Sequence, residues 1–415
     1  MPKLAVLGGK PIRAEKFPDW PVYGQSDIDW VTRAIQSGRW GGFPYPGPLT
    51  KEFAEKFLEM QGGNYAIPMA NGAITMEVAL RAAGIGWGDE VIIPAYTFQA
   101  SAAGPMAAGT LPVFVDINPE NYCLDPKQLE KAITSKTKAV IVVHIGAQMA
   151  DMDAILEIAE KNNLVVIEDS AHAHGAIWHD KGAGTIGDFG SFSFQSAKSL
   201  TTGEGGLLIC KDKKMAERVA SIIDCGRPKD PDGAEYTMGI NYRMTELQAA
   251  LGLAALERFP DQLAERARMA DYLEEQLQEL PGINMLKKDT RLTQRSLYRY
   301  IFKIDTKFFN CTNHIFCNVL THEGIPADTG YPAMHQYDLF KPQLSKLPVP
   351  SAFPEYFEFE RMSFPVAERA SLVEAVWVGE KIFRAGEKGI DDLIAGIKKL
   401  IANRDELASF ATQKK

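Results

Sequence analysis

The sequence predicts an α/β fold: a large domain built on a mostly parallel central sheet, followed by a smaller C-terminal α/β domain. Between residues 73 and 167, short apolar runs alternate with helical stretches of about ten residues, as in a parallel sheet covered by helices. A long helical stretch and a second group of strands and helices follow. A chain of 415 residues also exceeds what one hydrophobic core usually organises, so we expect two domains, residues 1–258 and 259–415.

The elements of the first domain follow in order. The opening segment is rich in proline, glycine and aromatic residues, and its one clear helical stretch lies near Ile28–Gln36. The next predicted helices are Ala73–Ala83, Thr97–Ala108, Lys127–Ile133 and Met152–Lys161, and the predicted strands are Glu90–Pro94, Leu111–Val115, Ala139–Val143 and Leu164–Ile167. Gly190–Phe194 and Gly206–Cys210 have no room for a helix between them, so we expect a hairpin or neighbouring strands.

The second half of the chain begins with a helical stretch, Arg243–Leu280, that we expect to be broken at Pro260. Its first part, Met244–Leu256, has apolar residues at helical spacing and could link the two domains. Beyond it we predict a strand at Ser296–Ile304 and helices at Asn313–Glu323 and Gly389–Ala402.

Composition excludes several classes of protein. Apolar residues make up 46% and charged residues 24%, which is ordinary for a soluble globular protein. The net charge of -8 opposes non-specific binding to nucleic acid or an anionic membrane, and no apolar stretch is long enough to span a bilayer. The first residues do not form a signal peptide, and the five cysteines are scattered without a CxxC pair. We therefore expect a cytoplasmic protein with neither nucleic-acid nor membrane partners.

The segment 164–175 gives the strongest indication of a binding site. An apolar strand ends in Glu168 and Asp169, and ligands of parallel α/β sheets bind at the carboxyl ends of strands. A buried carboxylate needs a partner, because its desolvation alone is very unfavourable, and a protonated heterocyclic nitrogen is one such partner. The alternative is that Asp169 only caps the next helix, and this segment alone leaves both possibilities open.

Lys198 gives the second indication, because it lies among small and apolar residues between two predicted strands. A partly desolvated lysine has a lowered pKa and can form a Schiff base with a carbonyl group. Gly203, Gly205 and Gly206 allow the backbone to pass close to a ligand. The alternative is that Lys198 is an exposed lysine in a turn. The Asp169 segment and the Lys198 segment together favour the Schiff-base interpretation over this one.

Weaker signals lie at two helix starts. The N–H groups around Gly72 and Ala73 would favour a phosphate, and Phe98 would either stack on a flat ring or fill the core. Histidines at 172, 174 and 179 lack the HxxxH or HExxH spacing, so no metal is expected. The chain also has no G-x-S-x-G elbow, which argues against a serine hydrolase.

Taken together, these segments resemble the DegT/DnrJ/EryC1/StrS family of pyridoxal 5'-phosphate (PLP) dependent aminotransferases, which have the fold-type I architecture. The resemblance covers residues 17–400 and is most specific at Glu168–Gly175 and Lys198–Gly206. Asn241–Thr245 is also similar to the family's N-Y-R-[ML]-[ST/N] motif. The resemblance makes residues 1–258 the PLP-binding domain, with an N-terminal arm.

The resemblance implies a role for each matching residue. Lys198 would form the Schiff base with PLP, and Asp169 would pair with its pyridine nitrogen. His172 would contact the 3-hydroxyl group, and Phe98 would stack on the ring. The phosphate contacts would come from Gly72, Ala73 and Ser193, with Asn241 reaching the phosphate of the neighbouring subunit in a homodimer with shared active sites.

Two positions bear on the expected chemistry. Ala73 stands where the family usually has serine or threonine, so the backbone contact to phosphate can remain while the hydroxyl contact is lost. Lys198 is present where the family's sugar dehydratases have histidine, which argues for transamination. Lys198 would then move a proton as general base and acid, while Asp169 keeps the ring nitrogen protonated.

The expected reaction moves an amino group from glutamine or glutamate to a keto-sugar or keto-cyclitol. The segments 17–21, 225–228 and 375–377 look most similar to two branches, the glutamine-dependent aminocyclitol enzymes and enzymes similar to 3-amino-5-hydroxybenzoate synthase. Candidate substrate residues are Arg227, Tyr331 and His335, each of which could equally be a surface or core residue. The alternatives are a PLP-dependent dehydratase or aromatising enzyme on the same scaffold, and a non-catalytic PLP-binding regulatory protein.

Overall fold

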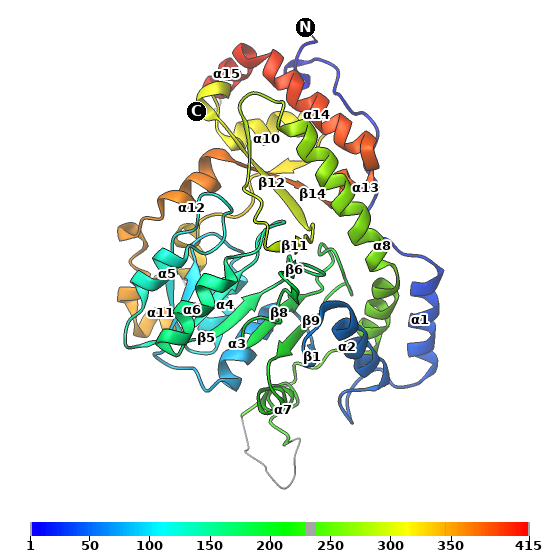
Figure 1. The fold of residues 1–415 in the computed structure, drawn as a ribbon, viewed down its shortest axis with the longest axis vertical. Helices are drawn as coiled ribbons and strands as arrows, with labels where there is room; N and C mark the ends of the chain where they lie inside the picture. Colours follow the sequence, from blue (N-terminus) through cyan, green and yellow to red (C-terminus); the bar gives the residue numbers. More distant parts are fainter. Residues whose placement is uncertain (1, 229–237, 345, 414–415) are drawn as a thin grey trace.

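The computed structural model describes residues 2–228, 238–344 and 346–413 (Figure 1). Its central feature is a seven-stranded sheet in the order β1-β9-β8-β5-β4-β2-β3. The strands are Tyr65–Met69 (β1), Glu90–Pro94 (β2), Leu111–Val115 (β3), Thr137–Val143 (β4), Val165–Asp169 (β5), Phe189–Ser193 (β8) and Gly206–Cys210 (β9). Only β9 runs against the others, since it pairs antiparallel with both β1 and β8. The predicted mostly parallel sheet is confirmed.

Helices cover both faces of this sheet, and strands such as β2 are therefore buried along their whole length. The apolar side chains of α1 (Gln25–Gln36) and α2 (Pro48–Gln61) pack with those of β8, β9 and the long helix α8 (Glu246–Leu277). The helices whose apolar residues join the main core include α3 (Ala73–Ala82), α4 (Ala100–Ala107), α5 (Pro126–Ala132), α6 (Met152–Asn162) and α7 (Lys213–Ile222).

Helix α8 corrects the expectation of a break at Pro260, because it continues through this residue to Leu277. Proline removes one helical hydrogen bond and crowds the preceding turn. Phe259 and Leu263, on either side of it, are buried in the cluster beneath α1 and α2, whereas Leu273 is buried in the C-terminal core. Burial at both ends therefore keeps the helix continuous, and it runs along the side of the molecule towards α14 (Figure 1).

The C-terminal part is built on a four-stranded sheet in the order β10-β12-β14-β13. The strands are Ile283–Met285 (β10), Arg299–Ile304 (β12), Ala327–Asp328 (β13) and Ala375–Gly379 (β14). The helices that pack on it are α10 (Asn313–His322), α14 (Gly386–Ala402) and α15 (Arg404–Gln413), together with the N-terminal Leu4. Residue 258, the predicted domain boundary, lies inside α8, so the division into two domains stays a prediction.

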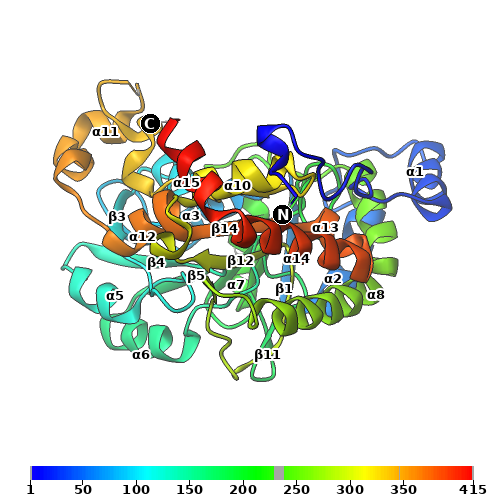
Figure 2. The same cartoon turned by 90° about the horizontal axis from the view of Figure 1, so that it is seen from above.

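Smaller elements complete the fold. A three-stranded sheet joins β11 (Leu292–Gln294) to β6 (Ile177–Trp178) and β7 (Lys181–Gly182). The short α-helices are Thr306–Phe309 (α9), Pro348–Ala352 (α11), Pro365–Arg369 (α12) and Glu380–Arg384 (α13), and the 3-10 helices are Ala5–Leu7, Met334–Gln336, Asp338–Phe340, Pro354–Phe357 and Phe359–Arg361, with a π-helical turn at Ala370–Glu374. Seen from above, α1 and α11 lie at opposite ends of the molecule (Figure 2). None of the helices in the described part of the chain has the length and apolar character that a membrane crossing requires.

Candidate active site

A cavity of about 450 Å³ lies at the carboxyl ends of the parallel strands, where ligands of α/β sheets bind. Asp169 ends β5 and Ser193 ends β8, while Phe98 follows β2. Tyr298 and Tyr331 reach the same cavity from the C-terminal half of the chain. The predicted site residues that line it are Gly72, Ala73, Phe98, Asp169, His172, Ser193, Lys198 and Tyr331.

Glu168 does not belong to this cavity, although it adjoins Asp169 in the sequence. Side chains alternate between the two faces of a strand, and Glu168 therefore faces the opposite side of β5. It is fully buried and lies 3.0 Å from the Nε2 atom of His144. Its oxygens also accept backbone N–H groups from Gly184 (2.9 Å), Ile186 (2.8 Å) and Gly187 (2.7 Å). These contacts make Glu168 a structural residue that holds the loop between β7 and β8.

Replacing Glu168 with glutamine should destabilise the protein by about 3 kcal/mol, because an N–H group would then face N–H donors in a buried site. Urea unfolding of the purified variant measures this loss. The matched control is Glu157→Gln on α6, whose carboxylate is exposed and pairs with Lys161, and this change should leave the unfolding free energy within the error of the measurement. Equal unfolding free energies for the two variants would contradict the structural role.

Asp169 is the carboxylate that faces the cavity, and it is 7% exposed. One of its oxygens accepts the hydroxyl of Ser101 at 2.8 Å, and the other accepts the N–H of Ala171 at 3.2 Å. A turn rather than a helix follows β5, so the helix-cap alternative for Asp169 is wrong. Both hydrogen-bond donors are neutral, so neither of them balances the negative charge of the Asp169 carboxylate. A protonated ring nitrogen would supply the missing positive charge.

Lys198 lies in the loop between β8 and β9, and its backbone N–H donates to the carbonyl of Gln195 at 2.8 Å. It is therefore in a turn, but its side chain lines the cavity instead of pointing to solvent. The Nζ atom lies 4.5 Å from the centre of the Tyr298 ring. Burial lowers the pKa of Lys198 to about 8; the nearby Asp169 carboxylate opposes this shift, and the Arg299 guanidinium adds to it. A lysine of this kind is a competent nucleophile near neutral pH.

The covalent capture of PLP by the cofactor-free enzyme should accelerate as the pH rises through about 8. With a pKa of about 8, the neutral and reactive fraction of Lys198 rises from roughly 10% at pH 7 to roughly 90% at pH 9. The rate constant, followed by stopped-flow absorbance, should therefore rise about ninefold over this interval and then level off. A rate that still climbs about eightfold between pH 9 and pH 10 would indicate an unperturbed lysine.

His172 is buried and is held by its backbone and aromatic neighbours. The N–H of Gly146 donates to its Nδ1 atom at 3.2 Å, so the proton of the neutral ring is on Nε2, 3.2 Å from the Tyr331 hydroxyl. The ring also packs against Tyr298, with centroids 4.3 Å apart. Burial lowers the pKa of His172 well below its usual value, and the charges of Lys198 and Arg299 act in the same direction. His172 is therefore a neutral hydrogen-bonding group.

Gly72 and Ala73 stand at the start of α3, where the first N–H groups have no acceptor within the helix. The helix dipole adds partial positive charge at this end, which favours a phosphate. A carbon atom added to Gly72 would lie 2.5 Å from the Cβ atom of Ser193, so only glycine allows this close approach. The cradle thus contains backbone N–H groups and the Ser193 hydroxyl, while Ala73 offers no hydroxyl group.

Three predicted site residues do not line the cavity. Arg227 is exposed, and its guanidinium lies 3.4 Å from the ring centre of Phe43. Asn241 is also exposed, and it forms an isolated antiparallel β-bridge with Asp224. His335 packs against the ring of Phe364, and its Nε2 atom lies 3.4 Å from a Glu368 oxygen. In a single chain these three residues therefore lie outside the candidate site.

The sequence interpretation missed Ser101 and Tyr298. Ser101 could have been found, because it lies four residues after Thr97, at the spacing of one helical turn behind a strand end. In the structure the two hydroxyls are 2.9 Å apart. Tyr298 gave no signal, since it lies 100 residues beyond Lys198 and reaches the cavity only through the packing of the C-terminal sheet.

The sequence matches the DegT/DnrJ/EryC1/StrS aminotransferase family over residues 22–381. The chain belongs to this family. It is an aminotransferase with the fold-type I architecture, and both predictions are confirmed.

Two curated relatives and one solved structure match this aminotransferase over almost their whole lengths. A Micromonospora echinospora protein with the provisional name L-glutamine:3-amino-2,3-dideoxy-scyllo-inosose aminotransferase is 38% identical and covers 98% of both chains. The L-glutamine:2-deoxy-scyllo-inosose aminotransferase of the same organism is 34% identical, covering 98% of this chain and all of that protein. The crystal structure of 3-amino-5-hydroxybenzoic acid synthase is 30% identical, with a TM-score of 0.83, and covers 94% of this chain and 100% of that one.

The residues of the cavity fit PLP, the cofactor that the family implies. Lys198 offers an amine for the aldehyde, and the buried Asp169 offers a carboxylate for the ring nitrogen. Phe98 lines the cavity, is 49% exposed and offers an aromatic face, and the start of α3 offers N–H groups for the phosphate. Each chemical group of the cofactor therefore has a complementary residue in this chain.

Proposed function

We propose that this aminotransferase moves the amino group of L-glutamine to a keto-cyclitol, with PLP as its cofactor. The observation that carries the proposal is the set of full-length relatives, 33–38% identical, named as L-glutamine aminotransferases of scyllo-inosose or its derivatives. Within a single chain, Lys198 is the one lysine or arginine among the described residues that line the cavity at the strand ends, and this supports an uncharged acceptor at that position. A diphosphate-bearing sugar would favour several cations, in particular arginines.

The residues of this chain would divide the work as follows. Lys198 would hold the aldehyde of the cofactor and, once the donor has taken its place, carry a proton on Nζ between the donor and the cofactor. Its lowered pKa keeps the neutral amine available near pH 8. Asp169 would keep the ring nitrogen protonated, and His172 would orient the ring hydroxyl through its Nε2 proton. When bound, PLP supplies the electron sink that makes the donor's α-proton acidic.

We further propose a homodimer in which each chain completes the active site of its partner. Asn241 belongs to the motif that the family resemblance assigns to the neighbouring phosphate, and its side chain is exposed. Large apolar side chains next to this motif are also exposed: Met238 (83%) lies three residues before Asn241, and the ring centre of Phe43 (55%) lies 4.7 Å from the guanidinium carbon of Arg243. Apolar surface of this kind is typical of an interface. Asn241→Ala should therefore weaken cofactor binding in the dimer, and mixing it with Lys198→Ala should restore part of the activity, which a monomeric site would not allow.

A donor and acceptor screen on the purified protein tests the proposal. Addition of L-glutamine should bleach the visible absorbance of the bound cofactor, and scyllo-inosose or its 2-deoxy derivative should restore it with formation of an aminocyclitol detected by mass spectrometry. A nucleotide-linked keto-sugar is the competing acceptor. Faster recovery with the nucleotide sugar, or bleaching with L-glutamate but not L-glutamine, would contradict the proposal. Conversion of an acceptor without any amino donor would favour the aromatising enzyme instead.

A further inference from the structure

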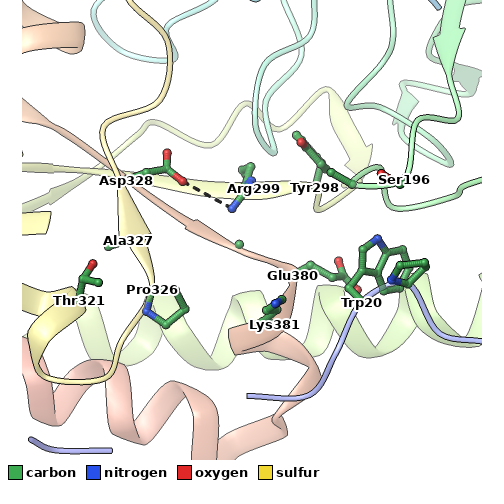
Figure 3. Close-up of a pocket in the computed structure, with 13 residues that line it drawn as sticks. Trp20, Ser196, Tyr298, Arg299, Thr321, Pro326, Ala327, Asp328, Glu380 and Lys381 are labelled. Atoms are coloured by element: carbon green, nitrogen blue, oxygen red, sulfur yellow. Dashed lines mark ion pairs between the residues drawn. The ribbon is translucent and has the colours of Figure 1, made fainter. Parts of the chain in front are cut away.

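A second cavity of about 470 Å³ adjoins the candidate active site (Figure 3). Tyr298 lines both cavities, and Ser196 and Ala197, which precede Lys198 in the loop after β8, line the second one. The charged residues along its wall are Arg299, Asp328, Glu380 and Lys381. A ligand attached at Lys198 can therefore extend along Tyr298 into a charged space.

Arg299 is the first residue of β12 and lies close to the reactive lysine. Its guanidinium carbon is 5.3 Å from the centre of the Tyr298 ring, the same ring that lies 4.5 Å from the Nζ atom of Lys198. The positive charge of Arg299 also contributes to the lowered pKa of Lys198 and of His172. Arg299 is therefore a cation of the second cavity that contacts the same aromatic ring as Lys198.

The guanidinium of Arg299 is only loosely engaged by the protein. Among the described residues its ion-pair partner is Asp328, with 3.7 Å between Nη1 and Oδ2, and the two side chains are 32% and 54% exposed (Figure 3). This distance exceeds that of a hydrogen bond, so the five N–H donors of Arg299 remain available for a ligand. A partly desolvated cation with free donors next to a reactive amine suits an anionic group.

Gly379 explains how Arg299 is positioned. The two residues are register partners in β12 and β14. A carbon atom added to Gly379 would lie 2.1 Å from Nη1 of Arg299, so the guanidinium crosses the neighbouring strand in a space that only glycine leaves open. The side chain is thus directed across the sheet towards the cavity before any ligand arrives.

From these observations we propose that Arg299 binds the α-carboxylate of the amino donor. The inference rests on the proposed function in one respect, that the donor is an α-amino acid. Such a donor carries its carboxylate on the carbon that bears the reacting amine, and must therefore place an anion a short distance from Lys198. The planar guanidinium can bind it through two parallel hydrogen bonds, with Asp328 as the weaker partner that the carboxylate displaces.

The test measures binding to the cofactor-loaded enzyme without turnover. α-Methyl-L-glutamine has no α-proton and cannot be transaminated, and its dissociation constant is obtained by calorimetry and by the change in cofactor absorbance. Arg299→Gln should weaken this binding by about 30- to 100-fold. Arg299→Lys should weaken it by about tenfold, because lysine keeps the positive charge but cannot form two parallel hydrogen bonds to the carboxylate. The affinity for PLP and the binding of the α-carboxamide analogue should change less than about twofold in both variants.

Two further variants make the outcome decisive. Arg268→Gln, on the exposed face of α8 where Arg268 pairs with Glu265 and Glu387, is the control and should bind the analogue like the wild type. Unchanged binding in Arg299→Gln, or a larger loss in Lys381→Gln, would overturn the assignment. If the wild type reacts with another amino acid instead of glutamine, the proposed function fails, while Arg299 is tested with the α-methyl derivative of that amino acid.

Discussion

Replacing Lys198 with alanine is expected to abolish the covalent attachment of PLP and to lower the rate of amino transfer by at least about 10⁴-fold. Two functions are lost together, because the same amine holds the aldehyde and moves the proton. The variant should still bind PLP non-covalently, since Asp169, Phe98 and the N–H groups at the start of α3 remain. Its fold should be intact, because the mutation removes a desolvated amine that the site does not need for packing.

Borohydride reduction followed by peptide mapping checks this expectation. The wild type should carry the reduced cofactor on the peptide that contains Lys198, and Lys198→Ala should carry none. Lys211→Ala is the matched control, because Lys211 follows β9 and its exposed amine pairs with Asp188 at 3.3 Å. A reducible adduct that persists in Lys198→Ala at another lysine would refute the assignment.

Asp169→Asn should reduce the transfer rate by about 10²- to 10³-fold, the second-largest effect that we expect. An amide has nearly the shape of the carboxylate, so it can still accept the hydroxyl of Ser101 through its oxygen. It lacks the charge that keeps a ring nitrogen protonated, and the loss of one partner of a buried charged pair costs about 3–5 kcal/mol. The variant should therefore bind PLP with a shifted absorbance maximum and transfer the amino group slowly.

Single-turnover kinetics with L-glutamine separates this effect from weaker donor binding. The rate of bleaching should fall, while the concentration of donor that gives half the maximal rate should change little. Ser101→Ala removes only one neutral hydrogen bond to Asp169 and should cost about tenfold or less. An Asp169→Asn variant that bleaches within threefold of the wild-type rate would mean that another residue supports the ring nitrogen.

Several elements of the fold could be predicted to the residue. The strands Glu90–Pro94 and Leu111–Val115 were placed with their observed limits, because a strand covered on both faces is a continuous apolar run. No strand was predicted at Tyr65–Met69 (β1), which contains Pro68; β1 lies at the edge of the sheet, where a missing N–H group is tolerated. The continuity of α8 through Pro260 depends on burial at both of its ends, which no local pattern reveals.

Some residues of the candidate site could also be predicted from the sequence, and others could not. The sequence by itself determined Asp169 at a strand end and Lys198 in a small-residue loop, because these signals are local and the family motif covers them. Only the tertiary structure separated Glu168 from Asp169, brought Tyr298 and Arg299 to the lysine, and left Arg227 and His335 outside the cavity. The physical reason is that a strand or a turn is encoded by neighbouring residues, whereas a cavity wall is formed by segments that meet only when two sheets pack together.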